Sequence, residues 1–441
     1  MNPFIRLPTE LIQDIAYLLP TNTDIVRFAS CSSDLAAKIL PAESHIWRRL
    51  FRDFYDDVRR RSLVEYKIEY QVRTIVLTRP ISLGHGQKEK ETFWLNLMMD
   101  VIMEALVPSD METDTGHEQK NLVRIREALT DTEFLNRPVS GYLMRKPDPP
   151  STLFCAVQLT LTFMALDPAM SIRCLRTDYD IGAVYNCPGT EKVLFHEGFS
   201  VSVETALDIR NFWLRHLLNP DEATFYSSYM SLPGYHRPGP PERSTYKKPP
   251  RISSSWLGFE SCICPLPATI PDLELRQTCA DLNGHMVEVE HITLELEQHL
   301  DTENWPELFQ ECISHLSEEP TRFRGTMTYH GSASDRSVTL RGFLEEVYGG
   351  GEGVVWRRIC FAAYERPQHL LSSTGSGVNG NGGQQGMSRF DEPWPPLDMA
   401  AEFTSIYAYE GVIIPGESLM IGQWWDARTE LSAGPFIFWC V

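Results

Sequence analysis

The amino-acid sequence predicts an α+β protein with three parts: a three-helix N-terminal module, a helical middle region and a mainly antiparallel β C-terminal domain, either barrel-like or a sandwich. Apolar residues recur at helical spacing up to about residue 218. After residue 250, short segments rich in Val, Ile, Tyr, Trp and Phe follow one another without helices between them. The proline-dense segment 233–250 separates the two patterns, because it suits neither a helix nor a central strand.

The composition limits the function classes. A chain of 441 residues suggests two or three domains, and 42% hydrophobic residues allow a sizeable core. The formal charge of −19 argues against nucleic acid or an anionic membrane as a partner. We find no signal peptide and no apolar run of membrane-spanning length, so we expect a cytoplasmic or nuclear protein, or one found in both places. The 10 cysteines are then expected to be reduced thiols.

Apolar side chains are dense in the N-terminal module. Thr9 is expected to cap a first helix, Thr23 or Asp24 to open a second and Ser33 to cap a third, and the segment 45–54 (HIWRRLFRDF) continues the apolar pattern. So few residues cannot enclose that many apolar groups. The surplus therefore predicts an exposed patch that binds a partner; the alternative is that it packs on the chain's own second domain.

The segment from Leu7 to Phe51 combines several motifs: a Leu-Pro pair, a Glu-Leu pair, a second Leu-Pro pair, the run DIVRFASCS and the closing run WRRLF. With this combination the segment resembles an F-box. Ser33 and Asp34 depart from the usual pattern of the family, but neither departure removes an apolar anchor.

The resemblance implies a partner and a role. F-boxes bind a Skp-type adaptor, which docks on a cullin–RING scaffold, so the chain is expected to be the substrate-recognition subunit of an SCF-type E3 ubiquitin ligase. Such a subunit is not an enzyme; it holds a protein target near the ubiquitin-charged E2. Two alternatives stay open: an adaptor-bound scaffold that acts without a cullin, and an enzyme with a site in the β domain. By matching positions, the resemblance assigns adaptor contacts to Leu7, Pro8, Leu11, Ile12, Ile15, Leu19, Ile25, Phe28, Leu35, Trp47 and Leu50.

The predicted domain organisation is an F-box at 1–55, a helical middle domain at 56–232, a Pro-rich linker at 233–250 and a β-rich substrate-binding domain at 251–441. A Gly/Ser/Asn-rich tract at 371–385 predicts a flexible loop.

Periodicity predicts the elements of the last three parts. Helices are expected at residues 93–106, 122–135, 153–166 and 205–218, and the third of these is apolar enough to be a strand instead. Strands are expected at 323–329, 337–347, 354–364, 403–414, 419–425 and 436–441, with a hairpin connection at 349–353.

The C-terminal segments SWLGFESCICPLP, VWRRICFAAYE and GPFIFWCV resemble uncharacterised C-terminal regions of fungal F-box proteins. More distantly, this part is similar to the β-barrel substrate domain of cyclin-binding F-box receptors. A peptide-binding barrel uses aromatic walls with a few polar anchors, and arginines suit an acidic or phosphorylated degron. Neighbouring strand residues point to opposite faces, so Trp424 and Trp425, or Arg357 and Arg358, cannot line one surface together. The candidate substrate-binding residues are Tyr407, Tyr409, Trp424, Arg324, Arg341 and Arg357; core packing is the alternative for each aromatic.

No cofactor, metal or catalytic residue is predicted. Cys262, Cys264, Cys279 and His285 are a possible zinc set, but the C-x-C spacing is tighter than usual and buried thiols are favoured. Residues 375–380 match G-x-G-x-x-G inside low-complexity sequence, where no strand precedes them.

Overall fold

The structure is a computed structural model of the chain. It describes residues 7–78, 88–107, 119–130, 132, 134–136, 150–170, 179–186, 193–196, 200–221, 223–241, 252, 254–262, 289–298, 320–331, 335–349, 355–365, 405–427 and 432–441. These residues divide into two compact units, one ending at Phe134 and the other beginning at Leu135. The helices of the predicted middle domain are therefore shared between both units.

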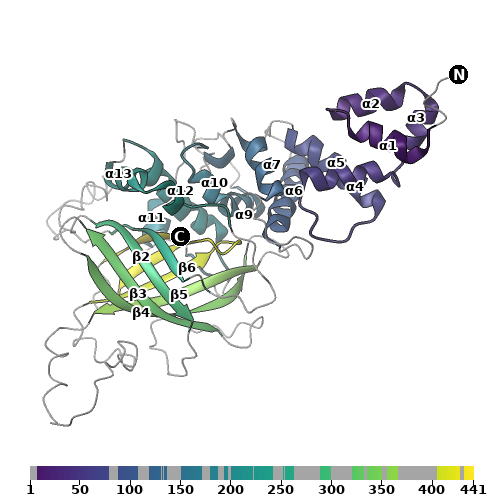
Figure 1. Cartoon of the computed structure of the whole chain (residues 1–441). Helices are drawn as coiled ribbons and strands as arrows, with labels where there is room; N and C mark the ends of the chain where they lie inside the picture. The colour runs from purple at the N-terminus through teal and green to yellow at the C-terminus, as the bar shows by residue number, and fades with distance from the viewer. Residues whose placement is uncertain are drawn as a thin grey trace, which may run out of the picture. The chain divides into compact units, whose positions relative to one another are not determined.

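The first unit is helical in its described residues (Figure 1). The N-terminal segment forms four helices instead of the predicted three, because HIWRRLFRDF is a helix of its own. The caps also lie earlier than predicted: Thr21 accepts a hydrogen bond from the backbone N–H of Asp24, Ser32 accepts one from Leu35, and Thr9 is the first helical residue. The helices are α1 Thr9–Tyr17, α2 Asn22–Ser30, α3 Ser33–Ile39, α4 His45–Phe54, α5 Leu63–Thr78, α6 Lys88–Leu106 and α7 Lys120–Leu129.

Aromatic packing and buried ion pairs join these helices. The α5 residue Tyr66 meets Phe51 of α4 edge-on, with 5.5 Å between ring centroids. Nearby, the fully buried side chain of Arg61 bonds to Asp57 at 3.1 Å and to Glu69 at 3.0 Å. Because the apolar face of α4 packs on α5, part of the surplus in the N-terminal module is covered by the chain's own helices, as the alternative hypothesis allowed.

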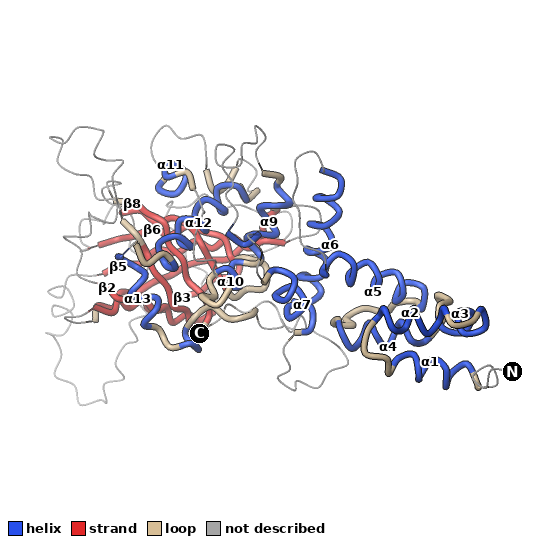
Figure 2. Tube along the Cα trace, turned by 90° about the horizontal axis from the view of Figure 1, so that it is seen from above, coloured by secondary structure: helices blue, strands red, loops and turns tan. Residues whose placement is uncertain are grey.

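The second unit places helices on one side of a β-barrel (Figures 1 and 2). The segment predicted as a helix or a strand at 153–166 is helical and buried on all sides. Aromatic contacts connect helices and barrel: the Tyr229 and Trp439 rings lie 5.8 Å apart, and those of Phe225 and Phe259 5.9 Å apart. The short helix η2 Phe134–Asn136 begins at the last residue of the first unit. The other helices of the second unit are α9 Thr152–Thr160, α10 Thr162–Ala165, α11 Ile181–Tyr185, α12 Val203–Leu218, α13 Ala223–Ser231 and η3 Gly234–His236.

The strands form a closed antiparallel barrel in the order β1 to β8, which confirms the barrel among the two predicted architectures. Six strands, β3 to β8, coincide with predicted ones, and β4 and β5 pair on either side of the predicted hairpin connection. The first two strands were missed. Their bounds are β1 Ser255–Glu260, β2 Val289–Gln298, β3 Thr321–Gly331, β4 Arg336–Tyr348, β5 Val355–Glu365, β6 Ser405–Ile413, β7 Leu419–Asp426 and β8 Ala433–Cys440.

The barrel interior is filled by apolar side chains from all eight strands. Glycines make room for the Phe436 ring: a Cβ on Gly422 would lie 2.7 Å from it, and one on Gly411 would lie 2.6 Å from it. Such distances are too short for carbon contacts, so these positions need glycine. The interior is therefore a packed core along much of its length, and a binding site has to lie at an end or on the outer surface.

Candidate functional site

Helix α1 has one buried and one exposed apolar face. Ile12 and Ala16 are fully buried, and α1 contacts α3 and α4. Leu11 and Leu18 project from the other face, with 48% and 78% of their surfaces exposed. Leu18 directly follows α1 as its C-cap residue and keeps a helical backbone conformation. Positions i and i+7 share a helix face, so the two leucines lie in one row. Exposed leucines in a row are the pattern expected of a protein-binding surface.

The structure divides the residues that the F-box resemblance assigned to adaptor contact. Ile12, Ile25, Leu35, Trp47 and Leu50 are buried inside the first unit and form part of its core. Pro8 and Leu11 are exposed, and the rest of the set is half-buried: Leu7, Ile15, Leu19 and Phe28. The buried members can support a binding face, whereas the exposed and half-buried members can contact a partner directly.

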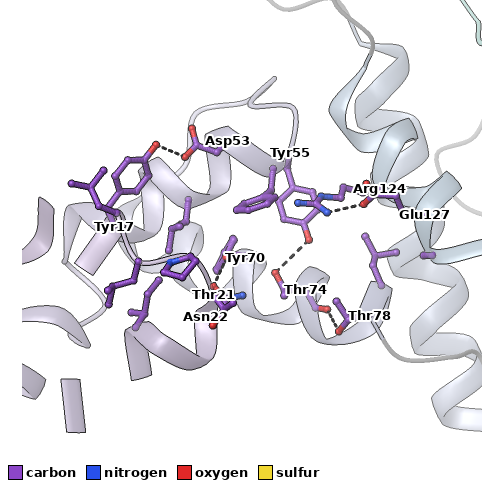
Figure 3. A pocket seen from close by; sticks show the side chains of 18 of the residues that line it. Tyr17, Thr21, Asn22, Asp53, Tyr55, Tyr70, Thr74, Thr78, Arg124 and Glu127 are labelled. Atoms are coloured by element: carbon purple, nitrogen blue, oxygen red, sulfur yellow. Dashed lines mark hydrogen bonds and ion pairs between the residues drawn. The ribbon is translucent and has the colours of Figure 1, made fainter. Parts of the chain in front are cut away.

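A groove adjoins the C-terminal end of α1. Its volume is about 1050 Å³, and its walls come from the α1–α2 connection and from α4, α5 and α7. Tyr17 donates a hydrogen bond to Asp53 at 2.5 Å, and the hydroxyls of Tyr55 and Thr74 lie 3.4 Å apart; Figure 3 shows both pairs along the groove. Leu18 lines this groove, which therefore continues the exposed row of α1. Sequence reasoning missed it because its walls come from helices far apart in the chain.

In the second unit, the predicted aromatic residues come together inside one end of the barrel. Tyr409 pairs with Trp424 across β6 and β7, and their rings lie 6.3 Å apart. Tyr407 meets Trp424 edge-on at 5.5 Å. Trp425 lies outside this cluster and packs with a separate group of buried residues. The alternation argument for Trp424 and Trp425 therefore holds.

A carboxylate, not an arginine, accompanies these rings. Tyr409 donates a hydrogen bond to Glu260 at 2.7 Å, and the Tyr329 hydroxyl lies 3.2 Å from that of Tyr409. Burial raises the pKa of Glu260 to about 7 and that of Tyr409 well above its ordinary value. Sequence reasoning missed Glu260; its only signal was an acid on the same strand face as Trp256 and Gly258.

The predicted arginines do not join the aromatic cluster. Arg324 and Arg341 face each other across β3 and β4, in register with neither Tyr407 nor Tyr409. Arg357 pairs with Ile413 at the opposite end of β6 and bonds to Glu417 at 3.0 Å. The structure therefore does not bring these arginines together with the aromatic residues, and a role for them in binding a target stays a prediction.

Arg358 is held in a buried ion-pair group on the other face of β5. It bonds to Glu345 and to Glu410, and its guanidinium lies 5.2 Å from the centre of the Phe195 ring. Burial lowers the pKa of Arg358, but the neighbouring Cys360, Glu410 and Glu345 side chains raise it above its ordinary value overall. A guanidinium engaged in this way is a structural group.

Two other sequence features fall largely outside the described residues. Cys262 is buried, while the remaining members of the possible zinc set and the G-x-G-x-x-G segment are not among the residues described. Within the described part of the chain, no group of His, Cys, Asp and Glu is arranged to hold a metal. None of the described helices has the length and apolar character needed to cross a membrane.

Comparisons of the chain with known protein families, with curated proteins and with solved structures find no match.

Proposed function

We propose that the chain is the substrate-recognition subunit of an SCF-type ubiquitin ligase: the N-terminal helices bind a Skp-type adaptor, and the barrel binds a protein target. The observation that carries this proposal is the exposed leucine row on α1, within a segment that has the motifs of an F-box. Leu11 is the residue on which the proposal depends most, because it belongs to the F-box-like motif and 48% of its surface is exposed.

The role requires no catalytic group in this chain. An adaptor–cullin–RING assembly brings the charged E2, and the receptor raises the effective concentration of the target beside it. The barrel is suited to the second task because its aromatic end carries half-buried polar groups from β1, β3 and β6, namely Glu260, Tyr329 and Tyr407.

Adaptor capture tests the proposal. The chain is co-expressed with a Skp-type adaptor, and Leu11→Asp is compared with Ile75→Asp on α5. The two side chains are exposed to 48% and 50%, so both changes add a charge to an equally exposed apolar position of the same unit. Burying an unpaired carboxylate in an interface costs about 2–4 kcal/mol, so Leu11→Asp should weaken capture by roughly 30-fold or more.

Ile75→Asp should leave adaptor capture unchanged. Normal capture by Leu11→Asp, or equal loss in both variants, would contradict the assignment of the α1 face. Co-purification of a cullin with the wild-type complex separates the ligase receptor from the scaffold alternative, because a scaffold retains the adaptor and lacks the cullin.

A further inference from the structure

Glu260 occupies an exceptional place in the barrel. It is the last residue of β1, opposite Phe436 of β8, and it shares its strand face with Trp256. Trp256 and Phe436 belong to the apolar interior cluster, so the Glu260 side chain enters the barrel at its end. An acid at an interior position costs stability unless it is paired, and this makes it a candidate for ligand contact.

Among the described residues, the Glu260 carboxylate accepts one side-chain hydrogen bond, from the Tyr409 hydroxyl at 2.7 Å, and belongs to no described ion pair. A carboxylate has about four acceptor positions, so most of its capacity remains. Tyr409 in turn is fixed by stacking on Phe361, with ring centroids 4.5 Å apart and planes at 5°. The phenol therefore holds the carboxylate in place without neutralising it.

The surroundings of this carboxylate are aromatic and partly exposed. Tyr409 and Trp424 are buried beneath it, while Glu260, Tyr329 and Tyr407 are each half-buried. We call Glu260, Tyr329 and Tyr407 the rim; they contact the buried Tyr409 and Trp424 side chains. Aromatic ring faces attract cations, and the attraction grows where water is excluded.

The charged groups nearest this end favour a cation as well. Arg336 faces the cluster from β4 but forms an ion pair with Glu365 and a 3.2 Å bond to the Ser405 hydroxyl. Asp426 lies opposite Tyr407 on β7. Because Arg336 and Glu365 neutralise each other, the net charge of these three groups is the negative charge of Asp426.

From this geometry we propose that the Glu260 end of the barrel binds a lysine or arginine side chain of the protein target, with the carboxylate meeting the cation and the aromatic groups meeting its alkyl chain. This inference rests on the proposed receptor function and names the chemistry of its target. The sequence led us to expect an acidic degron, which the arginines would bind beside the aromatic residues. Because those aromatic residues surround a carboxylate instead, we expect a basic target side chain.

Saturation-transfer NMR on the full chain tests the proposal with small probes. N-acetyl-lysine amide and N-acetyl-arginine amide should bind, whereas N-acetyl-norleucine amide and N-acetyl-glutamate amide should bind at least tenfold more weakly, since a charge-assisted hydrogen bond contributes about 1.5–3 kcal/mol. Glu260→Gln should remove this preference. Glu297→Gln, at an exposed position of β2, is the matched control and should keep it.

Two further measurements keep the result interpretable. Circular dichroism verifies that Glu260→Gln is folded. Tyr407→Leu changes the rim without altering the carboxylate and should weaken binding of the lysine probe several-fold. Equal binding of lysine and norleucine amides, or an unchanged preference in Glu260→Gln, would overturn the proposal. Binding of n-butylamine without binding of either amino-acid amide would also overturn it, because the site would then serve a free amine.

Failure of the lysine-binding proposal can be told apart from failure of the proposed receptor function. Lysine binding is measured on the chain alone, so it does not require the adaptor, and Leu11→Asp should keep it. A barrel that binds lysine in a chain that never captures the adaptor would refute the receptor function and leave the cation site standing.

Discussion

The ionisation of Glu260 should make the stability of the barrel depend on pH. Its pKa is about 7 in the folded protein against an ordinary value of 4.5, because burial disfavours the charged form. The folded state therefore holds this proton more tightly than the unfolded state. The stability that Glu260 contributes is fully present below pH 4.5, falls as the pH rises to about 7 and is constant above that.

The size of this change in stability follows from the difference between the two pKa values. A rise in the pKa from 4.5 to about 7 corresponds to a free energy of about 3 kcal/mol in total, since each pKa unit is worth about 1.36 kcal/mol. Between pH 5 and pH 8 the expected change is about 2.5 kcal/mol. Glutamine at position 260 does not titrate and can still accept the Tyr409 hydrogen bond. The stability of Glu260→Gln relative to the wild type should therefore rise by about that amount over this pH range.

Urea unfolding measures this difference. Tryptophan fluorescence reports on the barrel, whose interior contains Trp256 and Trp424. Unfolding curves of wild type, Glu260→Gln and the exposed control Glu297→Gln are recorded at several pH values. The comparison uses the change with pH, so a constant offset from altered packing does not affect it. Parallel profiles for wild type and Glu260→Gln would refute the view that burial shifts this carboxyl group.

Two further predictions concern stability alone. Ser32→Ala removes the hydroxyl that accepts a hydrogen bond from the Leu35 N–H and caps α3, so thermal unfolding of the first unit should show a loss of stability of about 1 kcal/mol. Ser33→Ala, at an exposed position, is the control. Equal effects of the two changes would contradict the role of Ser32 as a cap. Arg358→Met removes the ion pairs to Glu345 and Glu410 in a buried site, so urea unfolding of the barrel should show a loss of about 3 kcal/mol or more. A near-neutral result would mean that water already reaches those carboxylates.

Local patterns predicted much of the fold. Helix α12 and strands β3 to β8 lie where spacing and residue type indicated them, because each carries a long periodic or β-branched and aromatic run. Strand β1 was missed since six residues with glycine at the centre give little alternation. Strand β2 was missed because VEHITLELEQ alternates apolar residues with acids that also suit a helix surface. Its place in the barrel depends on pairing with β1 and β3, which local sequence does not encode.

The N-terminal site could be predicted in part. Most of the assigned apolar residues lie on helices, whereas Leu7, Pro8 and Leu19 lie outside α1. Burial divides the helical ones: Trp47 and Leu50 serve the core, whereas Leu11 faces solvent. A helical pattern identifies which residues share a face, and it cannot say which of two faces a neighbouring helix will cover. Here α5 covers α4, as the contact between Tyr66 and Phe51 shows.

The sign of the charge at the barrel site was beyond prediction for a related reason. Tyr407, Tyr409 and Trp424 are near one another along two paired strands, so their cluster follows from local sequence and one turn. The Glu260 carboxylate that accompanies them comes from β1, roughly 150 residues away in the chain. Its position inside the barrel depends on strand register, because a shift of one residue would put Glu260 outside and Phe259 inside. Arginines close in sequence, such as Arg357, lie at the other end of the barrel. Closure of the barrel between β1 and β8 therefore decides which charge the aromatic residues present, and with it the kind of target side chain that can bind.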